Sequence, residues 1–408
     1  MAPTILFLAE RYPPEVAGGG ELSAAMVARA VADQSGFDVR VLTQGDGTEG
    51  EVDGVPVSYT IPRAHDAIPD DISRAELLTA RAVPAVAKAL KGADMVHSVS
   101  VRTIPTAVAA ARLARKPATS VVNDTWATCF THTHVRRGEY CPECSRKELR
   151  QCLEDIGGNV SASPIIWHQF RRRIKAMKRL DGVVAVCPAI KRLLVDHGIK
   201  APVEFIPLPL DLAPFEGVPA IEVETGLVTI IGRLSTGKGV LETVEAFANA
   251  AQGRDPARLL VVGDGPLKEP AQERARDMGV AQSVEFVGWL DPSELPAIYG
   301  RSQVVMAPFM RVEALGRVTI EAAAAGRPVL TTDIGGGSEV LHSEPGAGVV
   351  VDWRDQDAWV EALGGMLDDP QGCEAMGREA RRRVEELYGP EGVGPQYAEF
   401  FKSILGVE

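Results

Sequence analysis

Short apolar segments alternate with helical segments along the chain, and this alternation constrains the fold more than any other feature. In the first half the strand-like segments are residues 4–9, 38–43, 95–101, 118–123, 182–187 and 203–206. Helical segments lie between the first two, at residues 21–34, and between the next two, at 106–114. The second half repeats the alternation from residue 228 to about residue 351. Short buried strands that alternate with helices form parallel sheets, so the sequence predicts an α/β protein.

A proline-punctuated connector divides the two halves. It reads Ile-Pro-Leu-Pro-Leu-Asp over residues 206–211. A chain of 408 residues is longer than one domain of about 150 residues. We therefore expect an N-terminal domain over residues 1–207 and a C-terminal domain over residues 212–388. A final segment, residues 389–408, carries aromatic and apolar side chains at helical spacing, namely Tyr397, Phe400, Phe401 and Leu405.

The overall charge and the distribution of apolar residues exclude two classes of protein. The formal net charge is −12, which argues against general affinity for nucleic acid. No window reaches the ~18 consecutive apolar residues of a membrane span. The apolar run at residues 5–9 is too short for a signal peptide. We therefore expect a cytoplasmic protein, in which the 6 cysteines are reduced or bind metal rather than form disulfides.

Two strands of the second half end in glycine-rich turns that suit a phosphate group. The first runs into Gly232 and Arg233, and Lys238 follows shortly after. The second ends in a tight turn between Gly263 and Gly265. Glycines let backbone amides approach a ligand closely, and the two cations favour an anion.

Two glutamates, Glu313 and Glu321, stand on either side of a predicted helix start at Leu315-Gly316. Glu313 is expected in the loop before the helix, and Glu321 inside the helix. A helix N-terminus presents free N–H groups and a partial positive charge, which suits a phosphate. Carboxylates accept hydrogen bonds from hydroxyl groups, so the pair suits the hydroxyls of a transferred sugar and of a ribose.

These elements, followed by Gly335 and Glu339, resemble the motifs of the GT-B family 4 glycosyltransferases, also called group 1, in the family's order. The family patterns are G-R-L-x-x-x-K-G, G-x-G-P, E-x7-E and G-G-x-x-E, and the last carries an extra glycine here. The resemblance implies two facing Rossmann-like domains with a cleft between them. The donor nucleotide would bind the C-terminal domain and the acceptor the N-terminal domain, and the last helix would cross back to the N-terminal domain.

The resemblance also assigns roles to residues of these motifs. Arg233, Lys238 and Glu313 would be catalytic, with the two cations meeting the charge of the leaving diphosphate so that no metal ion is needed. The donor site would comprise Gly19, Gly20, Gly232, Gly263, Gly265, Leu315, Gly316 and Glu321. The family implies retention of anomeric configuration, and we expect a UDP-sugar before a GDP-sugar as donor.

The acceptor side is expected in the first half of the chain. The glycines at residues 18–20 follow the first strand and open a helix, and the family uses this loop to reach the donor phosphates or the acceptor. His97 occupies the first position of the family's H-x-H pattern, whose second position is Val99 here, and Asp124 follows another strand. We predict His97 and Asp124 as acceptor contacts, with His97 also catalytic. The alternative for His97 is a packed, hydrogen-bonded core residue.

Four cysteines, Cys129, Cys141, Cys144 and Cys152, fall within residues 129–152. The C-x2-C pair is a common half of a zinc site, and four thiolates can close a tetrahedral zinc site or hold an iron–sulfur cluster. One of the histidines at positions 132 and 134 can replace a thiol. A subset of family 4 carries a similar cysteine-rich insertion. A structural zinc ion is the first interpretation, and a cluster or free cysteines are the alternatives.

The segment at residues 167–179 reads as a basic amphipathic helix. Its apolar side chains predict packing against the core, and its cations suit contact with the anionic inner face of a membrane, where lipid-linked acceptors lie. A surface helix without a partner is the first interpretation. Peripheral membrane contact is the alternative.

The sequence as a whole predicts a glycosyltransferase that uses a nucleotide-sugar donor and a saccharide, lipid-linked or small-molecule acceptor. Two other kinds of protein fit the same motifs. One is a nucleotide-sugar epimerase, which releases no nucleoside diphosphate overall, or a phosphorylase, which requires inorganic phosphate. The other is a sugar-nucleotide-binding protein that does not turn its ligand over.

Overall fold

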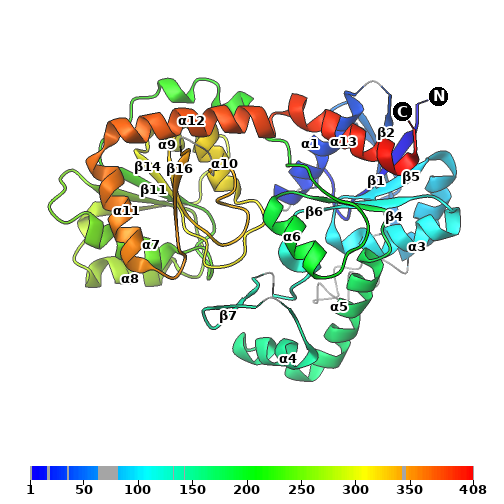
Figure 1. Cartoon of the computed structure of the whole chain (residues 1–408), viewed down its shortest axis with the longest axis horizontal. Coiled ribbons are helices and arrows are strands. Elements are labelled where there is room, and N and C mark those ends of the chain that lie inside the picture. Colours follow the sequence, from blue (N-terminus) through cyan, green and yellow to red (C-terminus); the bar gives the residue numbers. More distant parts are fainter. Residues whose placement is uncertain are drawn as a thin grey trace. The chain divides into compact units, whose positions relative to one another are not determined.

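A computed structural model of the chain describes residues 2–15, 19–34, 36–62, 81–131, 133–141, 143–341 and 346–407. The chain divides into two compact units (Figure 1). Unit 1 comprises residues 1–136, 140–210 and 388–408, and unit 2 comprises residues 137–139 and 211–387. The division at residues 210 and 211 falls inside the proline-punctuated connector, and the last helix is part of unit 1.

Unit 1 is built on an 8-stranded sheet with the order β10-β9-β6-β5-β1-β2-β4-β3. The strands are β1 Thr4–Leu8, β2 Asp38–Gly45, β3 Glu49–Val52, β4 Val55–Pro62, β5 Met95–Ser98, β6 Ala118–Val122, β9 Gly182–Ala185 and β10 Val203–Phe205. Neighbouring strands are parallel except β3 and β4, which are antiparallel. Strand β1 lies between β2 and β5, so the strand order reverses beside it, and ligands of open α/β sheets bind at such a point.

The helices of unit 1 are α1 Gly19–Ala32, α3 Ile104–Ala114, α4 Arg146–Asp155, α5 Ser163–Met177, α6 Pro188–Asp196 and α13 Pro390–Leu405. The last helix, α13, packs against α1 (Figure 1). Phe401 of α13 places its ring centroid 6.2 Å from that of Phe7 on β1 and 6.2 Å from that of Phe37. These edge contacts between buried rings make the end of the chain part of the core of unit 1. A short ribbon, β7 Val135–Arg136 with β8 Glu139–Tyr140, lies in the cysteine-rich segment.

Unit 2 contains a 6-stranded sheet with the order β13-β12-β11-β14-β15-β16, and all its neighbouring strands are parallel. The strands are β11 Leu227–Ile231, β12 Arg258–Val262, β13 Val284–Gly288, β14 Val304–Ala307, β15 Val329–Thr332 and β16 Gly348–Val351. In sequence order this is the 3-2-1-4-5-6 arrangement of dinucleotide-binding folds, which reverses between β11 and β14.

The helices of unit 2 are α7 Val240–Ala250, α8 Lys268–Asp277, α9 Leu295–Arg301, α10 Arg317–Ala324, α11 Gln356–Asp368 and α12 Pro370–Tyr388. Trp359 of α11 is buried in the core beside Phe247 of α7, and its indole N–H donates to the carbonyl of Asp352 at 3.0 Å. Within the described ranges of both units, no helix is long and apolar enough to cross a bilayer.

Candidate active site

A pocket of about 80 Å³ lies in unit 2 where β11 and β14 end. The loop after β11 contributes Gly232, Arg233 and Lys238, and the loop after β14 contributes Pro308 and Phe309. Arg233 is exposed, and no salt bridge within the described residues holds its guanidinium. The structure therefore brings both predicted catalytic cations to the point where the strand order of the sheet reverses.

Gly263 and Gly265 allow the neighbouring turns at this edge of the sheet to approach each other closely. A Cβ atom on Gly263 would lie 1.9 Å from the carbonyl oxygen of Gly232, and one on Gly265 would lie 2.4 Å from that of Leu234. Both glycines have positive φ, 130° and 153°, which strains an L side chain. The close approach of these turns explains why both positions are glycine. Contact of either glycine with a donor remains a prediction.

Lys238 and Glu313 form an ion pair beside this pocket. The Lys238 Nζ atom lies 2.7 Å from Glu313 Oε2 and 5.3 Å from the centre of the Phe309 ring. Arg311, which was not predicted, places its Nη2 atom 3.6 Å from the same carboxylate oxygen. The side chains of Lys238 and Glu313 are 27% and 21% exposed. Solvent therefore screens the pair less than it screens an ordinary surface ion pair.

Glu321 lies on α10, which begins after Leu315 and the N-cap residue Gly316, as predicted. Its Oε2 atom accepts a hydrogen bond from the Tyr299 hydroxyl at 2.9 Å, and its Oε1 atom accepts from Arg317 at 2.9 Å. Burial first, and then the charge of Glu321, raises the pKa of Tyr299 far above its ordinary value. The carboxylate is thus fixed in orientation by two donors.

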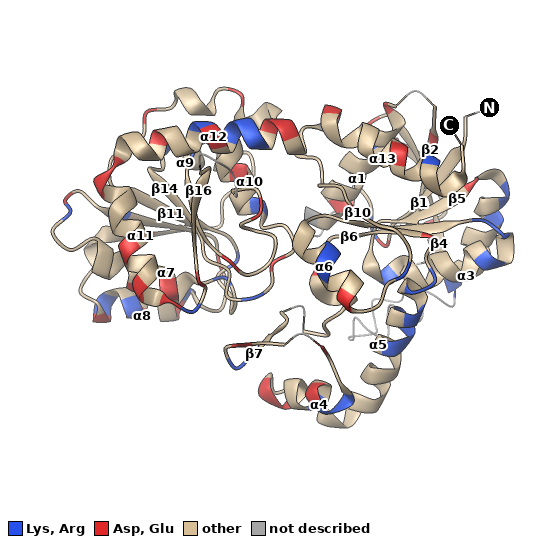
Figure 2. Cartoon of the chain, in the orientation of Figure 1, with Lys and Arg blue, Asp and Glu red and all other residues tan. Residues whose placement is uncertain are grey.

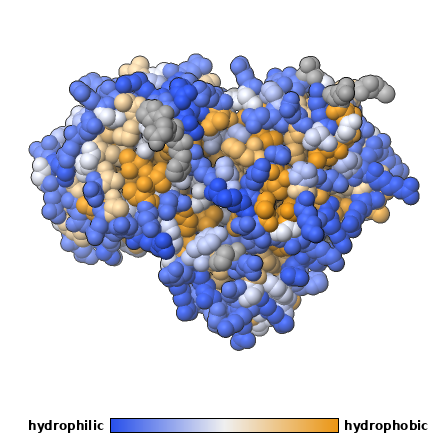
Figure 3. Space-filling view, viewed as in Figure 1, coloured by the Kyte–Doolittle hydropathy of each residue, from blue (hydrophilic) through white to orange (hydrophobic). Residues whose placement is uncertain are grey.

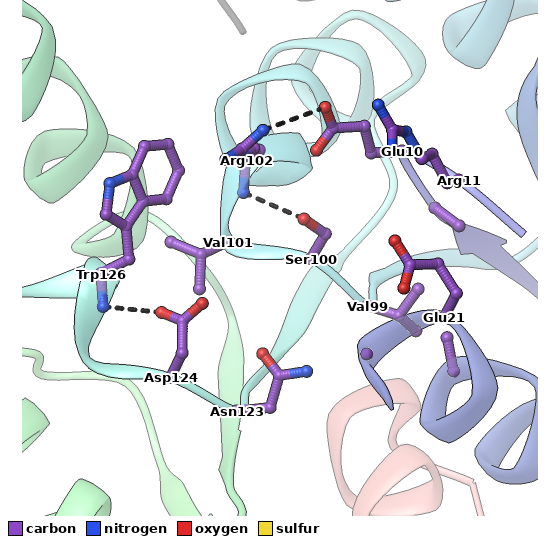
Figure 4. A pocket seen from close by; sticks show the side chains of 13 residues that line it. Glu10, Arg11, Glu21, Val99, Ser100, Val101, Arg102, Asn123, Asp124 and Trp126 are labelled. Carbon is purple, nitrogen blue, oxygen red and sulfur yellow. Dashed lines mark hydrogen bonds and ion pairs between the residues drawn. The ribbon is translucent and has the colours of Figure 1, made fainter. Parts of the chain in front are cut away.

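A larger pocket, of about 330 Å³, lies in unit 1 (Figure 4). It occupies the point where the sheet reverses its order, with lining residues from the ends of β1, β5 and β6 and from the start of α1. Its charged and amide side chains are Glu10, Arg11, Glu21, Arg102, Asn123 and Asp124. Carboxylates accept hydrogen bonds from hydroxyl groups and arginines bind anions, so the pocket suits a hydroxyl-rich ligand that carries an anionic group.

Asp124, a predicted acceptor contact, lines this pocket and caps the short 3-10 helix after β6. Its Oδ1 atom accepts a hydrogen bond from the Trp126 amide at 2.6 Å. Burial raises the pKa of Asp124, and the amide together with the charges of Arg173 and Arg102 opposes that rise. Predicted donor residue Gly20 lines the same pocket. Its neighbour at position 19 begins α1, and residues 16–18 of this loop lie outside the described residues.

The sequence reasoning missed several polar residues of this pocket. The guanidinium of Arg102 lies 3.4 Å from Glu10 Oε1 and 5.0 Å from the centre of the Trp126 ring. The guanidinium of Arg173, from α5, covers the same ring at 3.6 Å. Each of them follows the end of a predicted strand by one to three residues: Glu10, Arg102 and Trp126. That position was the signal that would have found them.

His97 is in the core, and the prediction that it contacts the acceptor is corrected here. Its side chain has no exposed surface. Its ring packs against Phe401 at 5.0 Å and Phe7 at 5.2 Å between centroids, and its Nδ1 atom shares a hydrogen bond of 2.8 Å with Thr119. A side chain so enclosed cannot touch an acceptor, whereas Val99, just beyond the end of β5, lines the pocket. Burial lowers the pKa of His97 to about 3, so the ring is neutral.

The four cysteines of the predicted metal site line one small pocket in unit 1, of about 20 Å³. They come from the segment after β6, from the C-x2-C turn and from α4. The Cys129 sulfur accepts a hydrogen bond from the His134 amide at 3.4 Å. Burial first, and then the neighbouring thiols, raise the pKa of Cys144. The four thiols therefore line one pocket, and the raised pKa of Cys144 keeps its thiol protonated at neutral pH.

The described residues of this segment do not form a finished coordination sphere. Neither unit contains, in the part that the structure describes, a group of three or more His, Cys, Asp or Glu side chains arranged to hold a metal ion. His134 uses its Nε2 atom with the Thr128 hydroxyl and its Nδ1 atom with the Cys141 carbonyl, both at 2.9 Å. His134 is thus unsuited to replace a thiol, and position 132 lies outside the described residues.

Two protein-family models match the chain in succession. The model described as Glycosyltransferase Family 4 matches residues 17–214, and the model described as Glycosyl transferases group 1 matches residues 216–383. The chain belongs to the group 1 glycosyltransferases. The predicted family is confirmed, and the two models together extend over both structural units of this glycosyltransferase.

Curated relatives of this group 1 glycosyltransferase match about half of the chain. The GDP-mannose-dependent alpha-(1-6)-phosphatidylinositol monomannoside mannosyltransferase of Mycobacterium tuberculosis is 32% identical over 220 residues, which cover 50% of this chain and 57% of that protein. The D-inositol 3-phosphate glycosyltransferase of Corynebacterium urealyticum is 32% identical over 192 residues, covering 45% of this chain and 44% of that protein. The chain thus spans about half the length of the curated relatives it matches.

Solved structures confirm the predicted GT-B fold. The sucrose-phosphate synthase of Thermosynechococcus elongatus has a TM-score of 0.74 at 18% sequence identity and covers 99% of each chain. The Anabaena protein Alr3699/HepE, solved in complex with UDP, has a TM-score of 0.69 at 18% identity and covers 98% of this chain and 100% of its own. At such identities the likeness concerns the fold alone.

Proposed function

We propose that this protein transfers a sugar from a nucleoside diphosphate sugar to an acceptor hydroxyl, with retention of anomeric configuration. The observation that carries the proposal is the Lys238–Glu313 ion pair beside the exposed Arg233, at the reversal point of a Rossmann-ordered sheet. Because the chain belongs to a glycosyltransferase family, we assign these side chains to a reaction in which a nucleoside diphosphate leaves the sugar and an acceptor hydroxyl attacks it.

The chemistry follows from the charges of the unit 2 pocket. As the bond between the sugar and the diphosphate breaks, negative charge grows on the leaving oxygen. Arg233 and Lys238 are fixed cations that stabilise this charge without rearranging, and the free amides at the start of α10 supply further donors. These cations perform the role that a metal ion has in other sugar transferases, so we infer catalysis that is independent of added metal.

Glu313 has a second role in this proposal. In the free protein its carboxylate forms ion pairs with both Lys238 and Arg311. When a diphosphate takes over those two cations, the carboxylate is free to accept hydrogen bonds from the hydroxyls of the donor sugar. The attacking acceptor oxygen forms the new bond to the sugar, and its proton passes to the leaving phosphate oxygen. No separate general base is required in that step.

The unit 1 pocket is assigned to the acceptor. Glu10, Glu21 and Asp124 accept hydrogen bonds from hydroxyls, and Arg11 is an exposed cation that suits a phosphate on the same molecule. The name of one matched relative contains GDP-mannose and phosphatidylinositol monomannoside, and the name of another contains D-inositol 3-phosphate. We therefore put GDP-mannose beside the UDP-sugars as first donors to test, and a phosphorylated polyol as first acceptor.

The test begins with donor binding and turnover. The protein is incubated with UDP-, GDP- and ADP-sugars, and its protection from thermal unfolding is compared with release of nucleoside diphosphate after acceptor is added. Protection by one nucleotide class and acceptor-dependent release support the proposal. Isomerised donor without release indicates an epimerase, and a requirement for inorganic phosphate indicates a phosphorylase. Binding without turnover over the whole panel indicates a binding protein.

The cysteine pocket supports a structural metal ion as a second, separate proposal. Four thiols from three segments converge on one small cavity. A zinc ion bound by Cys129, Cys141, Cys144 and Cys152 would draw them into tetrahedral contact and link the C-x2-C turn to α4. Such an ion would supply folding energy to this segment and take no part in sugar transfer.

A further inference from the structure

Helix α5 and the two residues that follow it carry six arginines and lysines, and one of them, Arg173, is buried. Its side chain is 8% exposed and lies on the same helix face as the buried Phe170, Ala176 and Met177. The other five are exposed: Arg171, Arg172, Lys175, Lys178 and Arg179. Figure 2 shows basic residues along α5, and Figure 3 shows predominantly hydrophilic side chains over the part of unit 1 that contains α4 and α5. A buried arginine loses its hydration, so its surroundings must compensate the charge.

The buried guanidinium of Arg173 lies against the indole ring of Trp126. Its Cζ atom is 3.6 Å from the centre of that ring, and the Trp126 side chain is itself only 6% exposed. A cation over the face of a tryptophan is attracted by the negative charge of that face, and the attraction is stronger away from water. The stack therefore fixes the ring of Trp126 and links α5 to the segment after β6.

Trp126 belongs to the turn that orients Asp124. This turn is the 3-10 helix Thr125–Ala127, and Asp124 is its N-cap residue. The Trp126 amide donates a hydrogen bond of 2.6 Å to Asp124 Oδ1 (Figure 4). A side chain that holds the ring of Trp126 therefore also holds the amide that orients the carboxylate. Asp124 lines the unit 1 pocket and Arg173 does not, so Arg173 acts on the pocket through its neighbours.

Arg173 also acts on Asp124 through its charge. Burial raises the pKa of Asp124, and the Trp126 amide, the charge of Arg173 and then that of Arg102 oppose this rise. Arg102 lies 3.4 Å from Glu10 and shares its charge with that carboxylate. Among the described residues, the charged groups that line the same pocket from β1, α1 and the loop after β5 are Glu10, Arg11, Glu21 and Arg102. Arg173 adds a cation from α5, outside the pocket.

We propose that Arg173 is a positioning residue of the acceptor pocket, which holds the Trp126 turn in place and presents its positive charge to the Asp124 carboxylate. The inference rests on the proposed function, because Asp124 is assigned there to the acceptor. An ionised carboxylate only accepts hydrogen bonds, so it binds an acceptor hydroxyl in one orientation. A protonated carboxyl also donates, and the hydroxyl then loses that orientation. Arg173 thereby sets the pH range over which the acceptor is held for attack.

The experiment compares Arg173→Gln and Arg173→Lys with a matched control, Arg171→Gln. Arg171 is an exposed cation of the same helix, and its guanidinium lies 5.8 Å from the centre of the Trp167 ring. Arg173→Gln should lower kcat/KM for the acceptor about tenfold, as for interacting neighbours. The acidic limb of its pH profile should move to higher pH, because the carboxylate loses a stabilising cation. Arg173→Lys keeps the charge, so its acidic limb should stay in place, and Arg171→Gln should behave like the unaltered protein.

A second comparison separates this role from a purely structural one. In a protein that already carries Asp124→Asn, Arg173→Gln should have a much smaller effect on transfer, because the carboxylate on which the cation acts is gone. Structural damage would instead lower the rate equally in both backgrounds and leave the pH profile unmoved, and that result overturns the inference. An acidic limb that moves as far in Arg173→Lys as in Arg173→Gln overturns it as well.

The ionisation of Asp124 can also be followed without the reaction. Carbon-13 NMR of protein labelled at the aspartate carboxyl carbons gives a titration curve for Asp124, and Asp124→Asn identifies its signal. Arg173→Gln should displace the midpoint of that curve to higher pH, and an undisplaced curve overturns the inference whether or not the protein is active. If the curve is displaced while the unaltered protein forms no glycoside with the whole donor panel, the proposed function alone is refuted.

Discussion

Replacing Lys238 by alanine separates catalysis from stability in the unit 2 pocket. The change removes a cation 2.7 Å from Glu313 and leaves that carboxylate with Arg311 at 3.6 Å. Because the partner keeps one cation, we expect a loss of only about 1–2 kcal/mol in the free energy of unfolding. A fixed donor aimed at developing negative charge contributes about 2.7–4 kcal/mol to the transition state, so turnover should fall by about 100- to 1,000-fold.

The assay compares nucleoside diphosphate release with urea unfolding for Lys238→Ala, Lys238→Arg and a control. The control is Arg254→Ala, which breaks an ion pair of the same length, 2.7 Å to Asp368, elsewhere in unit 2. It should lose similar or less stability and keep the wild-type rate. Lys238→Arg should recover part of the rate because it restores the charge. Wild-type turnover by Lys238→Ala, or an equal rate loss in Arg254→Ala, would refute the assignment of Lys238 to the leaving group.

Three further variants or measurements test the unit 1 pocket, the cysteine pocket and the buried His97. Asp124→Asn should slow transfer at least tenfold while calorimetry shows unchanged donor binding, since Asp124 lies in the unit 1 pocket; a defect confined to donor binding would contradict that assignment. Elemental analysis should find about one zinc per chain, and Cys144→Ser should destabilise unit 1, whereas metal-free protein with four titrating thiols would remove the site. Burial lowers the pKa of His97 to about 3, against 6.5 in an exposed histidine. Between these two values only the unfolded chain binds the proton, so the free energy of unfolding falls by about 1.4 kcal/mol for each pH unit below pH 6.5. His97→Leu should flatten that part of the urea-unfolding profile, and an unchanged slope would count against the buried neutral ring.

Several of the strands that the sequence predicted are buried on both faces. Strands β5, β6 and β9 are buried at every position, and their apolar and small residues form short segments that can be recognised without a structure. Strand β3 could not be recognised in this way. Its residues Glu49–Val52 are exposed along most of its length at the edge of the sheet, so no apolar run marks it.

Of the residues that line the unit 2 pocket, Gly232, Arg233 and Lys238 were singled out from the sequence, because they belong to one short local motif. Arg233 and Lys238 follow one strand, and Glu313 and Glu321 flank one helix start, so their order along the chain fixes their neighbourhood. Arg311 was missed because its place beside Glu313 depends on the path of a loop that carries no motif.

The unit 1 pocket could not be assembled from the sequence, since its lining comes from loops after β1, β5 and β6. Only the strand order brings these loops together, and that order was not readable from the chain. The error over His97 has the same origin. A residue within a strand and a residue just past its end differ by two positions, yet His97 is in the core and Val99 lines the pocket.

In the proposed reaction this protein forms a glycosidic bond and consumes a nucleoside diphosphate sugar. The most direct measurement quantifies nucleoside diphosphate and glycoside product in one reaction, with the anomeric configuration of the product read by NMR. We expect one diphosphate to be released per glycoside formed, the anomeric configuration to be retained, and the activity to be unchanged in a short assay with EDTA. Inverted configuration, strict dependence on added metal, or donor consumption without a glycoside product would contradict the proposed reaction.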